Sequence, residues 1–381
     1  MRRLITLILL FILNSPLSSS HIISKLSSKL NLGNNNNNII NSNLNLSPYA
    51  HQQDQSLHGR PLVDPLNPFV TATAHTQPPG STPTSTPANG NPPSQPQQPI
   101  LLPLPSLKFP KWLTDFTGLT EWPGMDPPYI PLDFINFNNI PPHIPIHQQG
   151  QCSGLNNGDL SQCSFDCFNC VSFDDVYTCP KLSQTFDDGP SPYTLKLLDN
   201  LKTKSTFFTL GVQIIRYPEI YRKTVEKGHI MGSHTWSHKF LPGLSNEQII
   251  AQLEWSIWAM NATNGHLPKW FRPPYGGIDN RIRSIIRQFG MQAVLWDFDT
   301  FDWKLLDATN YNHKPQDIYS NLNQFKINNG GKGLILEHDA VINTVDIGIE
   351  INHKILQNEI QFTVPQCVGG IDYIKKFEGM K

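Results

Sequence analysis

Two adjacent carboxylates, Asp187 and Asp188, lie where the sequence is best suited to chemistry. They end a strand-like run and enter a Gly-Pro turn, within residues 185–194. Side chains alternate along an extended strand, so a turn is needed to aim both carboxylates at one place. Two buried carboxylates repel unless a cation or a basic residue lies beside them. The alternative is an ordinary Asp-Asp-Gly turn with both acids in water.

A pair of histidines four residues apart, His234 and His238, supplies candidate metal ligands. One helical turn would place both imidazoles on the same side, and with one carboxylate they would form an open three-ligand metal site. Such a pair by itself is more often a surface or core feature. Thr235 stands where the helix of a zinc protease carries Glu, and the chain has no Gly-x-Ser-x-Gly turn. Both observations disfavour the corresponding hydrolase classes.

Three further polar clusters follow other predicted strands. They are Arg272–Tyr275, Asp299–Trp303 and His338–Asp339. In a parallel β/α barrel, functional side chains gather where strands end and the following loops begin. Five clusters in such positions predict one shared site on the rim of the barrel.

The elements that must position these residues alternate between strand and helix. Strands are predicted at 182–186, 205–210, 229–233, 270–272, 292–297, 333–337 and 361–364. Helix starts are indicated by a capping box of Ser245 with Gln248, by an Asp279 N-cap and by Pro315. About seven strand–helix units in about 200 residues predict a distorted or incomplete parallel (β/α) barrel, with an open doubly wound sheet as the alternative.

The chain before the barrel divides by composition. Residues 1–20 carry two arginines, an apolar run too short to span a bilayer and then small residues, which is the pattern of a cleaved signal peptide. An uncleaved N-terminal anchor is the alternative. Residues 21–100 are rich in Asn, Pro, Ser and Gln and predict a disordered stalk. Residues 101–178 form a Pro/aromatic and Cys-rich extension that we expect to lie across the folded domain, and 179–381 form the catalytic domain.

Several partner classes are disfavoured by the same reading. The formal net charge of -1 gives no support for a nucleic-acid partner. No second long apolar run follows the signal, so no transmembrane segment is expected. The last residues are polar and charged, which disfavours a lipid-anchor signal.

The six cysteines predict three disulfides in a secreted chain. They are Cys152, Cys163, Cys167, Cys170, Cys179 and Cys367. Five of them cluster, so the last has to reach back to one of the cluster, which would tie the far end of the chain to the start of the barrel. The other pairings stay open, and a four-Cys zinc site within 163–179 is the alternative. Asn45 and Asn261 begin sequons available for glycosylation.

Taken together, the five clusters resemble the motifs of the polysaccharide deacetylases of carbohydrate esterase family 4, the NodB homology domain. Their order and spacing match over roughly 179–367. The Cys-rich segment, residues 163–179, and the region 122–134 resemble fungal chitin deacetylases in particular. The resemblance implies that Asp188, His234 and His238 bind a divalent metal, usually Zn²⁺, with Co²⁺ or another divalent ion as alternatives.

The resemblance also implies roles for the remaining residues. Asp187 would be the general base, with Arg272 as its partner, and His338 would be the general acid, oriented by Asp302. The backbone N–H of Tyr275 would bind the oxyanion, and Trp303 and Leu336 would line the acetyl pocket. The aromatic residues Trp236, Tyr275 and Trp303 suit stacking on sugar faces, with packing support as the alternative.

The implied reaction is metal-dependent hydrolysis of the N-acetyl groups of chitin or chitooligosaccharides, giving chitosan and acetate. One alternative is an O-acetyl esterase acting on xylan or another polysaccharide. The other is a non-catalytic cell-wall protein that uses the groove to bind glycan. We expect a secreted monomer, extracellular or in the cell wall, with a cell-wall polysaccharide as its partner.

Overall fold

The computed structural model describes residues 107–142, 144–156, 158–306 and 313–377. The chain divides into two compact units, one of 1–48 with 132–134 and one of 49–131 with 135–381. Of the first unit, residues 132–134 are described, and everything below concerns the second unit. The predicted signal peptide, the stalk and the sequon at Asn45 lie outside the described residues.

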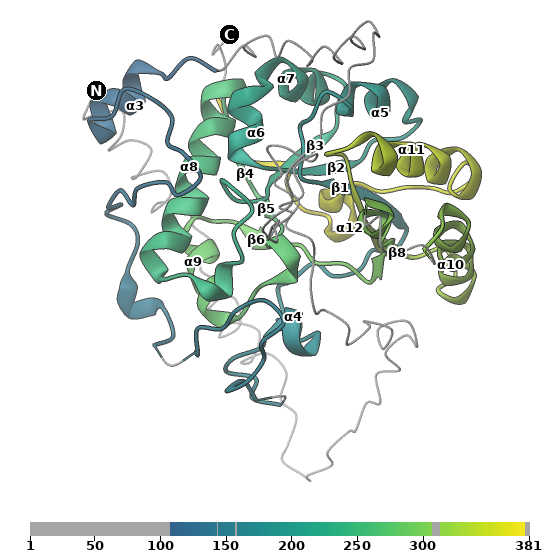
Figure 1. Cartoon of the computed structure of the whole chain (residues 1–381), viewed down its shortest axis with the longest axis horizontal. Coiled ribbons are helices and arrows are strands. Elements are labelled where there is room, and N and C mark those ends of the chain that lie inside the picture. The colour runs from purple at the N-terminus through teal and green to yellow at the C-terminus, as the bar shows by residue number, and fades with distance from the viewer. Residues whose placement is uncertain (1–106, 143, 157, 307–312, 378–381) are drawn as a thin grey trace, which may run out of the picture. The chain divides into compact units, whose positions relative to one another are not determined.

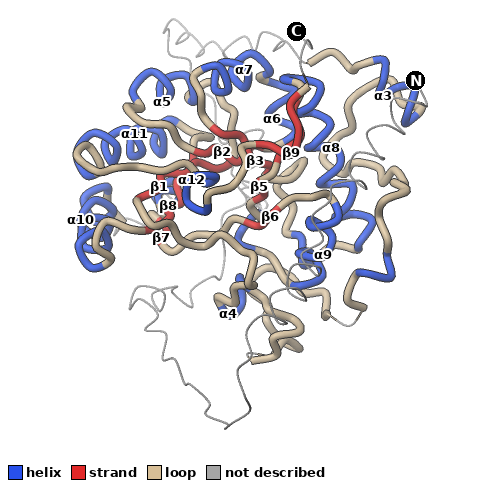
Figure 2. Tube along the Cα trace, turned by 180° about the vertical axis from the view of Figure 1, so that it is seen from behind, coloured by secondary structure: helices blue, strands red, loops and turns tan. Residues whose placement is uncertain are grey.

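A sheet of seven parallel strands forms the centre of the second unit, in the order β6-β5-β3-β2-β1-β8-β7 (Figure 1, with β7 labelled in Figure 2). The strands are β1 (Leu182–Asp187), β2 (Thr206–Thr209), β3 (Ile230–Ser233), β5 (Trp270–Phe271), β6 (Gln292–Ala293), β7 (Phe298–Asp299) and β8 (Gly333–His338). The two edge strands β6 and β7 both come from the stretch 292–299, so the sheet curls toward closure. The prediction of an incomplete parallel barrel is confirmed, and the open doubly wound sheet is wrong.

Helices connect the strands and surround them (Figure 1, Figure 2). They are α5 (Thr194–Asn200), α6 (Gly211–Arg216), α7 (Pro218–Glu226), α8 (Asn246–Asn264), α9 (Asn280–Gln288), α10 (Pro315–Asn328), α11 (Ile342–Glu350) and α12 (Val364–Val368). Two short helices, α3 (Lys111–Thr117) and α4 (Phe165–Phe168), precede the barrel, and β4 (His266–Pro268) pairs antiparallel with β9 (Tyr373–Lys376). None of the helices in the described ranges is both long and apolar enough to cross a membrane.

Local signals account for most of the helix boundaries. At the start of α8, Ser245 Oγ accepts from the N–H of Gln248, whose side-chain oxygen accepts from the N–H of Ser245. Asp279 caps α9, and Pro315 is the first residue of α10. The predicted capping box and helix starts are therefore confirmed.

The predicted strand at 361–364 is wrong. Gln361 forms an isolated bridge with Leu182, and helix α12 begins at Val364. Pro365 explains the difference, because proline cannot donate to a strand ladder but is favourable in the first turn of a helix.

The six cysteines form three disulfides, Cys152–Cys167, Cys163–Cys170 and Cys179–Cys367. All six lie in the described residues and none is free, so the four-Cys zinc site is wrong. As predicted, Cys367 reaches back to the cluster. It joins the residues before β1 to α12 across a sequence separation of 188, a closure that restricts the unfolded chain strongly.

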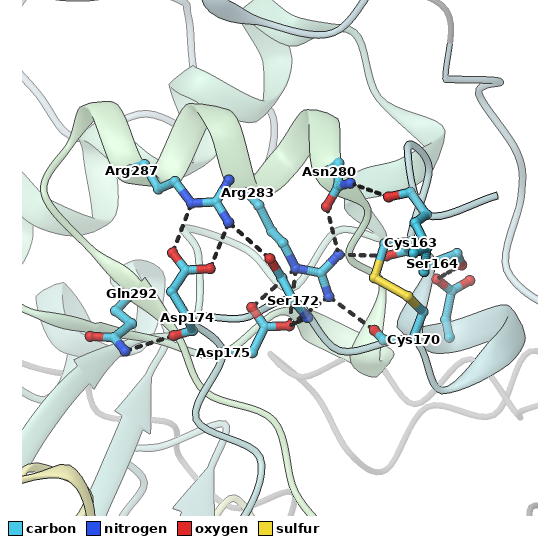
Figure 3. A network of polar contacts seen from close by, with 12 residues as sticks. Cys163, Ser164, Cys170, Ser172, Asp174, Asp175, Asn280, Arg283, Arg287 and Gln292 are labelled. Carbon is cyan, nitrogen blue, oxygen red and sulfur yellow. Dashed lines mark hydrogen bonds and ion pairs between the residues drawn. A yellow bond between two sulfur atoms is a disulfide. The ribbon is translucent and has the colours of Figure 1, made fainter. Parts of the chain in front are cut away.

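A buried arginine on α9, Arg283, holds the Cys-rich segment against the barrel (Figure 3). Its guanidinium pairs with Asp175 at 2.7 Å and donates to the carbonyl oxygens of Cys163 and Cys170. One turn later, Arg287 pairs with Asp174 at 2.6 Å, but this arginine side chain is 37% exposed. Water can solvate the charges of Arg287 and Asp174 if their ion pair breaks, but it cannot reach those of Arg283 and Asp175. The two ion pairs should therefore contribute differently to stability.

Replacing Arg283 by Met is expected to lower the free energy of unfolding by about 3–5 kcal/mol, because Asp175 stays buried without its partner. The matched change Arg287→Met should cost about 1 kcal/mol or less. Guanidinium unfolding with the disulfides intact measures both. Equal losses for the two variants would contradict this account of the Cys-rich segment.

The first described part of the extension, residues 107–131, packs on the barrel as expected. The ring of Trp122 stacks on that of Trp236 with centroids 6.1 Å apart. Further along, the N–H of Ile130 donates to Oε1 of Glu254 at 2.8 Å. Glu254 is fully buried in α8, and burial raises its pKa to about 8, although the N–H of Ile130 opposes the shift. The folded protein therefore holds this carboxyl protonated at neutral pH.

This protonation makes stability depend on pH in a defined direction. The unfolded chain releases the Glu254 proton near its ordinary pKa of 4.5, and the folded chain releases it near a pKa of about 8. The folded state binds the extra proton between those values, so this contribution to stability falls as the pH rises from about 4.5 to about 8. Glu254→Gln keeps an acceptor for Ile130 and cannot ionise. Its unfolding midpoint should match wild type near pH 5 and exceed it at pH 9, and a constant difference across that range would contradict the prediction.

Candidate metal centre and active site

The five predicted polar clusters all follow the carboxyl ends of parallel strands. They come after β1, β3, β5, β7 and β8, so the same rim of the sheet carries them. This agrees with the position expected for a functional site in a β/α barrel.

The three predicted ligands, Asp188, His234 and His238, form a group whose candidate ligand atoms all lie within 4.8 Å of one another. Nε2 of His234 and Nε2 of His238 lie 3.4 and 3.2 Å from Oδ1 of Asp188. Ligands about 2.1 Å from a tetrahedral ion lie about 3.4 Å apart, so this spacing fits a small divalent cation. Apart from these histidines, no donor among the described residues approaches that buried Asp188 oxygen.

The tautomer of His234 also suits a metal ligand. Its Nδ1 lies 2.7 Å from the carbonyl oxygen of Arg272. Because a carbonyl oxygen can only accept, Nδ1 carries a hydrogen, and in the neutral ring the lone pair that a metal ion would take is on Nε2, the nitrogen beside Asp188. Metal-binding histidines are typically oriented by such a bond from the other ring nitrogen. The residues present therefore fit a divalent ion.

The predicted helical turn between the two histidines is wrong. Residues 234–238 form an irregular loop in which Thr235 and His238 have φ of 74° and 61°. The N–H of His238 donates to Oγ1 of Thr235, and the two imidazole centroids are 5.0 Å apart. A helical turn is held by its own backbone bonds, whereas an irregular loop depends on contacts with the rest of the protein.

The adjacent carboxylates at the end of β1 have separate partners. Arg272 Nη1 donates to Asp187 Oδ1 at 2.9 Å and to Thr185 Oγ1 at 2.7 Å, and all three residues are buried. Asp188 has a φ of 78°, and its Oδ1 lies beside the histidines instead. Burial would raise the pKa of Asp188, but the charge of His238 and the contact with His234 hold it well below its usual range. The repulsion expected between two buried carboxylates is thereby offset.

A second histidine–carboxylate pair lies across the rim. Nδ1 of His338 is 2.7 Å from Oδ1 of Asp302, and the backbone N–H of His338 donates to the other Asp302 oxygen at 2.9 Å. Burial lowers the pKa of His338, but the charge of Asp302 and its hydrogen bond, with the charges of Asp188 and Asp187, raise it to about 10. The imidazole is therefore protonated at neutral pH and can serve as a proton donor.

The predicted pocket residues lie on the same rim. Tyr275 lies in a short 3-10 segment, Pro274–Gly276, with φ of 60°, and its ring centroid is 4.4 Å from that of His238. Trp303 follows Asp302 in the segment Asp302–Leu306, and Leu336 is buried in β8. Their roles in an acyl-binding pocket remain predictions.

The placement of Trp236 in an aromatic rim is wrong. Its indole is fully buried, and Nε1 donates to the carbonyl oxygen of Gly124 at 2.7 Å. Trp122 covers one face, and Trp255 packs edge to face with centroids 6.2 Å apart. With no exposed face, this side chain cannot stack on a sugar, and the alternative of packing support holds.

Asp339 lies beside the Asp pair, and no role for it is predicted from the sequence. Its carboxyl is buried behind Gly189, where an added Cβ would come within 2.4 Å of the carboxylate. Thr194 Oγ1 donates to this carboxyl at 2.5 Å, and the N–H of Asp339 donates to the carbonyl oxygen of Asp187. Burial raises its pKa to about 7, with the charges of Asp188 and Asp187 adding and Thr194 opposing. The residue fixes the turn that carries the Asp pair, a contact that sequence adjacency to His338 does not reveal.

The chain is similar in sequence to polysaccharide deacetylases, including chitin deacetylases of yeast. The family model described as polysaccharide deacetylase matches residues 175–294. The chain is 60% identical over 269 residues to Chitin deacetylase 2 of Saccharomyces cerevisiae, covering 71% of this chain and 83% of that protein. It is 53% identical over 270 residues to Chitin deacetylase 1 of the same yeast, covering 71% and 87%. The solved chitin deacetylase of Colletotrichum lindemuthianum aligns at 25% identity with a TM-score of 0.44, over 52% of this chain and 92% of that one.

Replacing Asp302 by Asn should lower the pKa of His338 from about 10, because burial is then opposed only by the charges of Asp188 and Asp187. Titration of the ring resonances in metal-free protein measures this. Asp166→Asn is the matched control, since it removes the carboxylate 3.0 Å from His147 and should leave His338 unchanged. A His338 pKa that stays near 10 in Asp302→Asn would contradict the assignment of its proton partner.

Proposed function

Because the chain belongs to the polysaccharide deacetylase family, we propose that it hydrolyses the N-acetyl groups of N-acetylglucosamine residues in chitin, giving chitosan and acetate. The proposal is supported by the identity with two yeast chitin deacetylases along most of their length. The observation that carries it is the presence, on one rim, of three residues that could hold a metal ion, a carboxylate held by an arginine and an imidazole hydrogen-bonded to a carboxylate.

The cation in this proposal is a divalent ion, with Zn²⁺ preferred and Co²⁺ as an alternative. Asp188, His234 and His238 would hold it, because two imidazole nitrogens and one carboxylate oxygen form a typical open catalytic zinc set. When bound, the ion supplies a Lewis acid that polarises the acetyl carbonyl and eases ionisation of the attacking water.

Asp187 acts as the general base. Its Oδ1 is fixed by Arg272, and its Oδ2 lies on the side of the metal group, 3.8 Å from Nε2 of His234. A carboxylate in this position can take the proton of a water that attacks the acetyl carbon. Arg272 itself is fully buried and bonded to the carbonyl oxygen of Leu295, so the orientation of the base is rigid.

The leaving group and the oxyanion are served by other residues. Protonated His338 gives its proton to the departing sugar amine, and Asp302 holds the ring in place. The backbone N–H of Tyr275 donates to the developing oxyanion, and such a donor is worth about 3 kcal/mol in comparable sites. Trp303 and Leu336 line the space for the acetyl methyl group.

Secretion to the extracellular space or the cell wall is part of the proposal. Three disulfides are typical of proteins in oxidising compartments. Glycosylation at Asn261 stays a prediction. That side chain lies near the end of α8 and is partly buried, and the hydroxyl of Thr263 already donates to Ala259.

Acetate release distinguishes the proposed activity from its alternatives. We expect release from N-acetylglucosamine oligomers, little from acetylated xylan, and none after treatment with a chelator. Release mainly from xylan would instead show an O-acetyl esterase. Tight glycan binding with no release from any substrate would show a binding protein.

Two variants separate the base from the metal ligands. Asp187→Asn should reduce acetate release by about 10³-fold or more and keep the metal, because the proton acceptor is lost and the ligand set is intact. His234→Ala should lose both activity and metal. Zinc content by elemental analysis is the measurement, and full zinc stoichiometry in His234→Ala would contradict the ligand assignment.

A further inference from the structure

The loop between the two histidine ligands is contacted by a much earlier part of the chain. Trp236 Nε1 donates to the carbonyl oxygen of Gly124 at 2.7 Å, and Ser237 Oγ donates to that of Met125 at 2.5 Å. The sequence separation is 112 residues for both bonds. We call Gly124–Met125 the strap. Its two acceptors hold the two residues that immediately precede His238.

Both strap contacts are shielded from water. Trp236 is 0% exposed and Ser237 is 3% exposed. Gln252 of α8 accepts from the N–H of Ser237 and donates to its Oγ, both at 2.9 Å, so water is not needed to satisfy the hydroxyl. A buried donor that loses its acceptor costs free energy, so the loop and the strap favour one relative position. For the Ser237 hydroxyl the cost is smaller, because Oε1 of Gln252 lies 3.3 Å away as a second acceptor.

The strap is anchored independently of the loop. Trp255 on α8 donates from Nε1 to the carbonyl oxygen of Pro128 at 2.8 Å, and Ile130 donates to Glu254. On the other side of the strap, Trp122 Nε1 donates to the carbonyl oxygen of Leu107 at 2.8 Å, and the N–H of Leu107 donates to the carbonyl oxygen of Ile215 in α6 at 2.6 Å. The strap is therefore held on both sides.

The barrel supports the first half of the loop and the strap supports the second. The N–H groups of Gly211 and Val212, at the start of α6, donate to the carbonyl oxygens of Thr235 and Trp236 at 3.0 Å. Beyond Trp236, the side-chain contacts to the strap and to Gln252 continue the support as far as Ser237. The next residue is the ligand His238.

The loop needs this support because its backbone is unfavourable. Thr235 and His238 both have positive φ, which costs free energy for residues other than glycine and persists where surrounding contacts impose it. We propose that the strap is a positioning element of the metal centre: it holds His238 in coordinating position and thereby sets the affinity for the divalent ion. This inference rests on the proposed metal centre, and it assigns a function to a segment that lies before the residues matched by the family model.

Two variants in the full chain test the strap. Ser237→Ala removes one donor, and Trp236→Phe removes the other while keeping most of the ring. The dissociation constant for Zn²⁺, measured on metal-free protein by competition with a chromogenic chelator, should rise about 10-fold or more in each, the scale expected when support of a metal ligand is lost.

The matched control is Trp255→Phe. It removes the same indole N–H from a fully buried tryptophan bonded to the same segment, but it keeps an aromatic ring against Trp236 and leaves both hydrogen bonds between the strap and the histidine loop in place. Its unfolding midpoint should fall about as much as that of Trp236→Phe, while its Zn²⁺ dissociation constant stays within about twofold of wild type. A merely structural role of the strap would move the midpoint and the affinity together in all three variants.

Unchanged Zn²⁺ affinity in Ser237→Ala and Trp236→Phe would contradict the proposed role of the strap. So would an equal loss of affinity in Trp255→Phe. If Trp236→Phe does not fold, Ser237→Ala decides. A wild-type protein that binds no divalent ion would overturn the metal centre and the strap with it. Wild-type protein that binds Zn²⁺ but releases no acetate would overturn the proposed reaction, and the variant affinities would still decide the strap.

Discussion

Two carboxylates on consecutive residues, Asp187 buried and Asp188 partly buried, repel each other, and the site is built around this repulsion. Asp187 is satisfied by Arg272 at the end of β5, while Asp188 turns through a positive φ toward the two histidines that follow β3. Because β3 and β5 are neighbours in the sheet, the positive partner and the metal ligands arrive on the same side of β1. The strand order thus supplies both partners, and the positive φ of Asp188 turns its carboxylate away from that of Asp187.

The loops after the strands carry the strain of the site. Asp188, Thr235, His238 and Tyr275 all have positive φ, which persists when surrounding contacts impose it. The Tyr275 segment is supported from the Cys-rich side, where the N–H of Phe165 donates to Ile278 O at 3.0 Å. Segments that precede the barrel in the sequence therefore take part in building its rim.

The same segments are tied firmly to the barrel. Cys179–Cys367 closes the ends of the catalytic region covalently, and the buried Arg283 binds two backbone carbonyls of the Cys-rich segment together with Asp175. These are interactions that water cannot replace, because the groups are buried. We infer that residues 107–131 and 163–175 unfold together with the barrel, which a supporting role at the metal centre requires.

The sequence by itself determined the parallel barrel, the helix caps at Ser245 and Asp279, three disulfides and the clusters at the strand ends, because strand periodicity, capping and cysteine count are local signals. It failed at Trp236, where residue type suggested a sugar platform, and at 234–238, where spacing suggested a helical turn. Only the tertiary structure decided the disulfide pairing, the burial of Trp236 and the contacts of Asp339 and of the strap. The strap, the contacts of Asp339 and Cys179–Cys367 join segments more than a hundred residues apart, for which a linear sequence carries no local signal. The other two disulfides are short-range, and the sequence leaves them open because several cysteines lie close together.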